Sequence, residues 1–109
     1  MKVSDGWMPI ADLVRTAEAV IVAREAEEPN VWAMTAFSRF RVVELLSVEP
    51  MALYGRDLDL DPVVLLEEAA TAVEQLVVPV ERVVWRLSLA AALRDAIADV
   101  RMVCGACDV

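Results

Sequence analysis

The sequence predicts an all-α fold, a small helical bundle of four main helices. Apolar residues recur at three- and four-residue steps along four segments, which is the period of an amphipathic helix. Prolines and a glycine stand at the boundaries of these segments. No segment alternates convincingly between apolar and polar residues as a strand would. With 109 residues, the chain is expected to form one domain.

The first helix is predicted from Pro9 to the residues before Pro29. Proline suits the first turn of a helix because its missing N–H would have no partner there. The apolar face of this helix consists of Ile10, Leu13, Val14, Ala17, Val20 and Ile21. Asn30 is the expected N-cap of a second helix over residues 31–48. Apolar residues surround most of that second helix, which predicts that it is central and buried on most sides.

The third helix has the clearest start signal in the chain, with Asp61 as N-cap and Pro62 at the first helical position. A short fifth turn is predicted before it, over residues 50–54, and Gly55 would stop it. The third helix should end before Pro79, which cannot continue it. Its predicted apolar face is formed by Leu65, Leu66, Ala69, Val73, Leu76 and Val77.

The last helix, predicted over residues 80–103, carries two apolar stripes on nearly opposite sides. The early stripe is Val80, Val83, Val84, Leu87 and Ala91, and the late stripe is Leu89, Leu93, Ile97 and Val100. A straight helix cannot bury both stripes against one neighbour. Either this helix is central and wide-faced, or one stripe packs on another subunit. The interface expected between subunits consists of Trp85, Leu89, Leu93, Ile97 and Val100.

Composition supports a protein partner. Hydrophobic residues make up 59% of the chain and the mean hydropathy is +0.52, so few polar residues remain to cover the surface. A second chain would bury the excess, and a homodimer is expected. The charge-free stretches are too short to span a membrane. The N-terminus does not read as a signal peptide, so a cytoplasmic location is expected. The arginine-rich, valine- and alanine-rich usage is typical of a GC-rich bacterial genome.

The net charge of −8 argues against binding a nucleic-acid backbone. An acidic chain would suit a basic partner surface, although acidity also serves solubility. The serines have no histidine base, because the chain contains no histidine. Glycines stand singly and form no phosphate-binding loop. The sequence therefore predicts no enzymatic activity and no cofactor.

Cys104 and Cys107 are the only cysteines, and they lie in a segment, residues 104–109, predicted to follow the helical domain of residues 1–103. The motif comes after a helix rather than at its start, so the helix dipole would not stabilise a thiolate. One pair supplies half of a zinc site, which needs four ligands. Two further interpretations are a C-terminal segment that a modifying enzyme acts on and an inert thiol pair in a reducing compartment.

These observations favour a non-enzymatic protein–protein interaction domain with an acidic surface, such as an adaptor, an inhibitor, an immunity-type protein or a regulatory subunit. One alternative is a ribosomal peptide precursor or carrier whose Cys104 and Cys107 are modified or bind metal. A second alternative is a dithiol redox protein.

Overall fold

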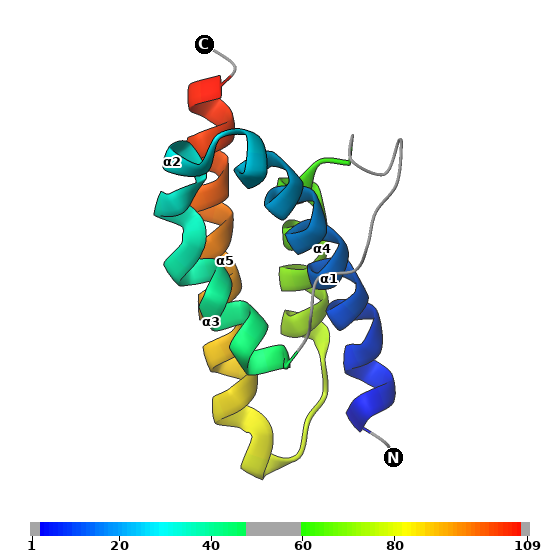
Figure 1. The fold of residues 1–109 in the computed structure, drawn as a ribbon. Coiled ribbons are helices and arrows are strands. Elements are labelled where there is room, and N and C mark those ends of the chain that lie inside the picture. Colours follow the sequence, from blue (N-terminus) through cyan, green and yellow to red (C-terminus); the bar gives the residue numbers. More distant parts are fainter. Residues whose placement is uncertain (1–2, 48–59, 108–109) are drawn as a thin grey trace.

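The fold is an all-α bundle, as the apolar spacing predicts (Figure 1). The computed structural model describes residues 3–47 and 60–107, with side chains for residues 8–47 and 60–104. No strand occurs in these ranges. The further turn predicted for residues 50–54 lies outside them. No helix in the described part of the chain is long and apolar enough to cross a membrane.

Helix α1 spans Val3–Glu27 and begins earlier than predicted. Pro9 therefore lies inside the helix instead of at its start. Inside the helix it removes one backbone hydrogen-bond donor. The predicted apolar face is otherwise confirmed. Its buried members are Ile10, Val14, Ala17, Val20 and Ile21.

The predicted second helix is divided into three pieces. Helix α2 spans Pro29–Trp32, a 3₁₀ turn spans Ala33–Thr35, and helix α3 spans Ala36–Leu46. The prediction of Asn30 as N-cap is wrong, because α2 already begins at Pro29. Helix α3 ends where Ser47 adopts a left-handed backbone conformation with φ of 54°.

The expectation that this segment is the central, mostly buried helix is also wrong. Trp32, Val42 and Leu46 are buried, but Phe37 is 89% exposed and Phe40 is 66% exposed. The reason is that α3 packs chiefly against α5 and leaves its other side without a neighbouring described element. The apolar residues around the whole helix predicted burial on most sides, but the neighbouring helices cover only one side of it.

Helix α4 spans Pro62–Gln75 and starts as predicted. The Asp61 Oδ1 atom accepts a hydrogen bond from the backbone N–H of Val63 at 2.9 Å, which satisfies one of the free donors at the helix start. Leu66, Ala69 and Val73 are buried. Val77 follows the helix and is exposed, so the apolar face ends earlier than predicted.

Replacing Asp61 with alanine should lower the free energy of unfolding by about 1 kcal/mol, because the cap hydrogen bond is lost. Asp61→Asn is the matched control, since an asparagine oxygen can accept the same bond. Urea unfolding monitored by far-ultraviolet circular dichroism measures both variants. Equal destabilisation by Asn and Ala would contradict the capping role.

Helix α5 spans Val83–Cys107 and follows a 3₁₀ turn over Val80–Arg82. It continues past the predicted end at residue 103, so the cysteine motif belongs to the helix. The late apolar stripe of α5 is buried, and the early stripe is not: Val80, Val84 and Leu87 are 87%, 75% and 56% exposed.

The helices form two antiparallel pairs, α1 with α4 and α3 with α5, and α4 also packs on α5 (Figure 1). The pairs join around one core. Small side chains such as Ala17, Ala69 and Ala96 let the helix backbones approach closely. The larger core side chains include Ile10, Val14 and Ile21 of α1, Trp32 of α2, Val42 and Leu46 of α3, Leu66 and Val73 of α4, and Leu89, Leu93 and Val100 of α5.

Candidate functional site

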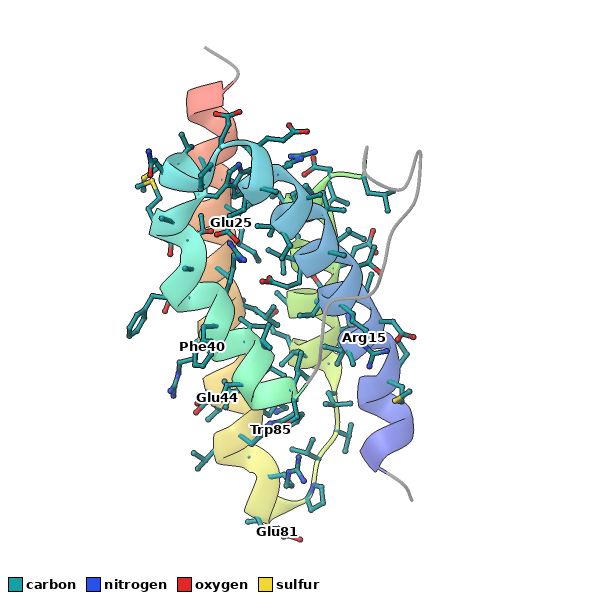
Figure 2. The ribbon with its side chains drawn as sticks, viewed as in Figure 1. Arg15, Glu25, Phe40, Glu44, Glu81 and Trp85 are labelled. Carbon is teal, nitrogen blue, oxygen red and sulfur yellow. The ribbon has the colours of Figure 1, made fainter. Side chains whose placement is uncertain are left out.

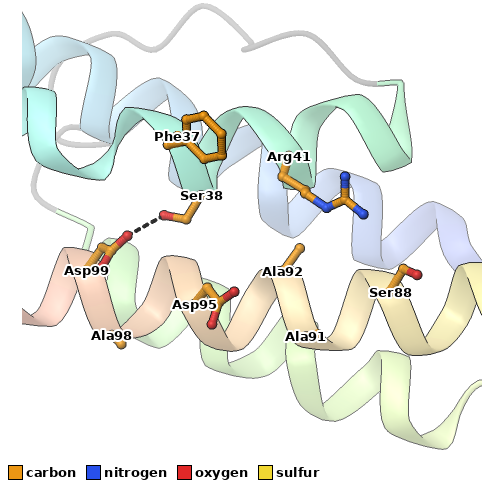
Figure 3. Close-up of a pocket in the computed structure, with 9 residues that line it drawn as sticks. All are labelled: Phe37, Ser38, Arg41, Ser88, Ala91, Ala92, Asp95, Ala98 and Asp99. Carbon is orange, nitrogen blue, oxygen red and sulfur yellow. Dashed lines mark hydrogen bonds between the residues drawn. The ribbon is translucent and has the colours of Figure 1, made fainter.

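A groove runs between α3 and α5 on the outer side of the bundle (Figure 3). Helix α5 contributes a line of small residues to its floor, and α3 contributes larger residues to its wall. The residues that line it are Phe37, Ser38 and Arg41 of α3 and Ser88, Ala91, Ala92, Asp95, Ala98 and Asp99 of α5. The small residues arise from the sequence of α5, in which alanine, serine and aspartate recur at helical spacing beside the buried stripe of Leu89 and Leu93.

Two hydrogen bonds connect the helices on either side of this groove. The Ser38 hydroxyl donates to Asp99 Oδ2 at 2.7 Å. The Trp85 indole N–H donates to the backbone carbonyl of Leu45 at 2.9 Å, by the end of α3 (Figure 2). The two bonds join α3 to α5 at different levels and so tie together the helices that line the groove.

Large apolar side chains stand exposed beside the groove. We define the α3–α5 face as Phe37 and Arg41 of α3 with Val84, Leu87, Ala91 and Asp95 of α5. Val84, Leu87 and Ala91 follow one another at steps of three and four residues, so they share one side of α5. Large apolar side chains left exposed on neighbouring helices are a feature of interaction sites on folded domains.

Charged residues of both signs stand on and beside this face, and the acidic Glu44, Asp95 and Asp99 outnumber the single cation Arg41. Arg41 and Asp95 are exposed on opposite sides of the groove (Figure 3). Neither forms an ion pair with another described residue, whereas Arg94 pairs with Glu74 and Arg101 with Glu67 on the α4 side of α5.

Behind the face, Arg39 is 7% exposed and anchors α3 to α1. Its guanidinium donates to the Glu18 carboxylate at 2.8 Å, to Glu25 at 3.4 Å and to the Thr35 hydroxyl at 2.9 Å. Burial alone would lower the pKa of Arg39, but the hydrogen bonds and the attraction of Glu18 and then Glu25 outweigh it and raise the pKa. Arg39 therefore stays charged, and its role is to hold α3 in place.

The residues expected to form an interface between subunits lie inside the chain. Leu89, Leu93 and Val100 are fully buried, and Ile97 is 9% exposed. Trp85 is half-buried, with the Arg82 guanidinium 4.7 Å from its ring centre. Four of these five residues are therefore already buried in the core of a single chain. The stripe that stays exposed is the early one, which the sequence pattern identified but could not distinguish from the buried stripe.

The predicted thiol segment has a different setting from the one expected. Cys104 is half-buried in α5 and packs against the core. Cys107 is the last residue of the helix, and its side chain lies outside the described residues. Within the described part of the chain, no cluster of three or more histidine, cysteine, aspartate or glutamate residues could hold a metal ion.

Comparison with known proteins gives no family assignment. No protein-family model, no curated protein and no solved structure matches this chain. A function must therefore be inferred from the residues of the α3–α5 face.

Proposed function

We propose that this chain is a non-enzymatic protein–protein interaction domain that binds its partner through the α3–α5 face. The observation that carries this proposal is the exposure of Phe37, Val84 and Leu87 on the two helices that line the groove and that hydrogen bonds join. Leaving such side chains in water forgoes about 1.5–3 kcal/mol for each that a partner would cover. An adaptor, an inhibitor, an immunity-type protein or a regulatory subunit in the cytoplasm would use such a surface.

The composition of the groove supports protein binding rather than catalysis. Its floor is formed by alanines and Ser88, which allow a partner helix or an aromatic side chain to approach closely. Among its polar groups, Asp99 accepts a hydrogen bond from Ser38 that joins the two helices. Arg41 and Asp95 are exposed at the sides of the groove. An apolar centre with a polar rim is the usual anatomy of a protein interface.

We do not propose a carrier function for the cysteines. A modifying enzyme needs an extended, accessible segment, and Cys104 lies half-buried within α5. A dithiol redox function is likewise not proposed, since both cysteines lie at the carboxyl end of a helix, where the dipole disfavours a thiolate.

The double variant Phe37→Glu, Leu87→Glu should abolish partner binding. Together these side chains account for about 3–6 kcal/mol of apolar burial in a complex, which corresponds to at least a ~100-fold loss of affinity. The measurement is gel filtration of the tagged full chain in a fresh extract of cells that express it. The unchanged chain should elute well above its own mass of 12.0 kDa, and the double variant should elute at that mass.

Val64→Glu is the matched control, because Val64 is an exposed apolar residue on α4, away from the face. It should elute like the unchanged chain. Elution of the unchanged chain at 12.0 kDa, or an equal effect of the control, would contradict the proposed binding surface.

A further inference from the structure

The acidic side chains around the α3–α5 face indicate what kind of partner fits it, an inference that rests on the proposed function. Glu44 on α3 and Asp95 on α5 are exposed, and neither has an ion-pair partner among the described residues. Asp99 accepts a hydrogen bond from the Ser38 hydroxyl, which leaves most of its carboxylate able to accept others (Figure 3). Arg41 is the one cation that lines the groove. Negative charge therefore predominates beside the exposed apolar side chains.

The acids on the α4 side of α5 are in a different situation. Glu67 pairs with Arg101 and Glu74 pairs with Arg94, so their charges are balanced within the chain. Asp95, on the groove side of α5, has no such cation in the described part of the chain. A molecule that covers the groove would gain attraction by supplying that cation.

We propose that the α3–α5 face binds an amphipathic helix of a partner protein, apolar on one side and rich in lysine or arginine along its edge. The apolar side would cover Phe37, Val84 and Leu87, which are exposed in the single chain. The basic edge would meet Asp95 and Asp99, which lie four residues apart on one side of α5. Bonds between such cations and carboxylates are stronger than those between neutral groups.

The shape of the face suits a helix better than an extended peptide. The groove lies between α3 and α5, whose backbone groups bond within each helix and offer no edge to which a strand could add. A bound helix satisfies its own backbone hydrogen bonds. Ala91 and Ala98 in the floor allow close approach of its side chains. From Val84 to Asp99, α5 is about 22 Å long, which matches a partner helix of about four turns.

Electrostatics distinguish this partner from other occupants. A nucleic acid or an anionic lipid surface would be repelled by Asp95, by Asp99 and by the net charge of −8. A second copy of this chain would bring the same acids towards one another. A basic helix avoids both penalties, and Arg41 would fix its register by pairing with one acidic side chain of the partner.

Selection from a phage-displayed library on the purified full chain tests this proposal, with helical peptides of about 15 residues to match the length of the face. Counter-selection on the Phe37→Glu, Leu87→Glu variant removes peptides that bind elsewhere. Enriched peptides should carry apolar residues at three- and four-residue steps and more lysine and arginine than the unselected library. Asp95→Lys should weaken binding of the most enriched peptide at least about tenfold in fluorescence anisotropy, because a cation would then face its basic edge.

Glu68→Lys is the matched control, because it makes the same charge change at an exposed position on α4. It should change the dissociation constant less than about threefold, since salt screens distant charges. Circular dichroism of each variant verifies the fold. Equal effects of Asp95→Lys and Glu68→Lys would overturn the proposal, as would a selection that enriches no peptide.

Two outcomes separate this proposal from the proposed function. Enriched peptides that require Phe37 and Leu87 but are neutral or acidic would overturn the basic partner and leave the function standing. Elution of the unchanged chain at 12.0 kDa in extract would contradict the function itself.

Discussion

Replacing Leu93 with alanine should lower the free energy of unfolding by about 3 kcal/mol, because it removes a fully buried side chain from the centre of α5 and leaves a cavity. This loss of stability arises within a single chain, so it should not change with protein concentration. Urea unfolding at two concentrations tenfold apart measures both the size of the effect and this independence.

Val77→Ala is the control for this variant, since Val77 is 73% exposed and lies outside the α3–α5 face. Its effect should stay within about 0.5 kcal/mol. A Leu93→Ala variant that altered only dimer mass, with unfolding of the monomer unchanged, would place Leu93 between chains and contradict the core described above.

Replacing Arg39 with methionine should cost about 3 kcal/mol or more of stability. The change leaves the Glu18 carboxylate, whose side chain is 12% exposed, without its partner, and an unpaired buried charge is strongly unfavourable. Thermal and urea unfolding of the purified chain measure the loss. The double variant Arg39→Met, Glu18→Leu should recover much of it, because an apolar pair of similar volume avoids the desolvation of both charges.

Arg101→Met is the matched control, because it removes an ion pair that is exposed to solvent. The Arg101 and Glu67 side chains are 62% and 49% exposed, so losing their ion pair should cost less than about 1 kcal/mol. If Arg39→Met proved as mild as Arg101→Met, the Arg39 cluster would not be what fixes α3 against α1.

Local signals in the sequence predicted the start of α4 and several apolar faces correctly, whereas the starts predicted at Pro9 and Asn30 were wrong. Asp61 and Pro62 define the start of α4 because capping and the fixed φ of proline are local effects. The spacing of apolar residues likewise identified the buried face of α1 and both stripes of α5. The end of α5 was misplaced, because the helix continues through Gly105 to Cys107.

Which stripe faces inward could not be predicted, because periodicity defines a face but not its neighbour. The early and late stripes of α5 are similarly apolar, and only the positions of α3 and α4 decide that Leu93 is covered while Leu87 is exposed. The role of Arg39 could not be predicted either, since its partner Glu18 lies 21 residues earlier on another helix. The candidate site was therefore present in the sequence as a pattern but could be recognised only from the packing.

The central claim is that the α3–α5 face is covered by another polypeptide in the cell. Its most direct test is a photo-reactive amino acid placed at position 37, compared with the same group at position 68, where Glu68 is exposed on α4. After irradiation of intact cells, the chain labelled at position 37 should gain the mass of a second polypeptide, and the chain labelled at position 68 should not. Absence of an adduct at position 37, or equal adducts at both positions, would contradict the account.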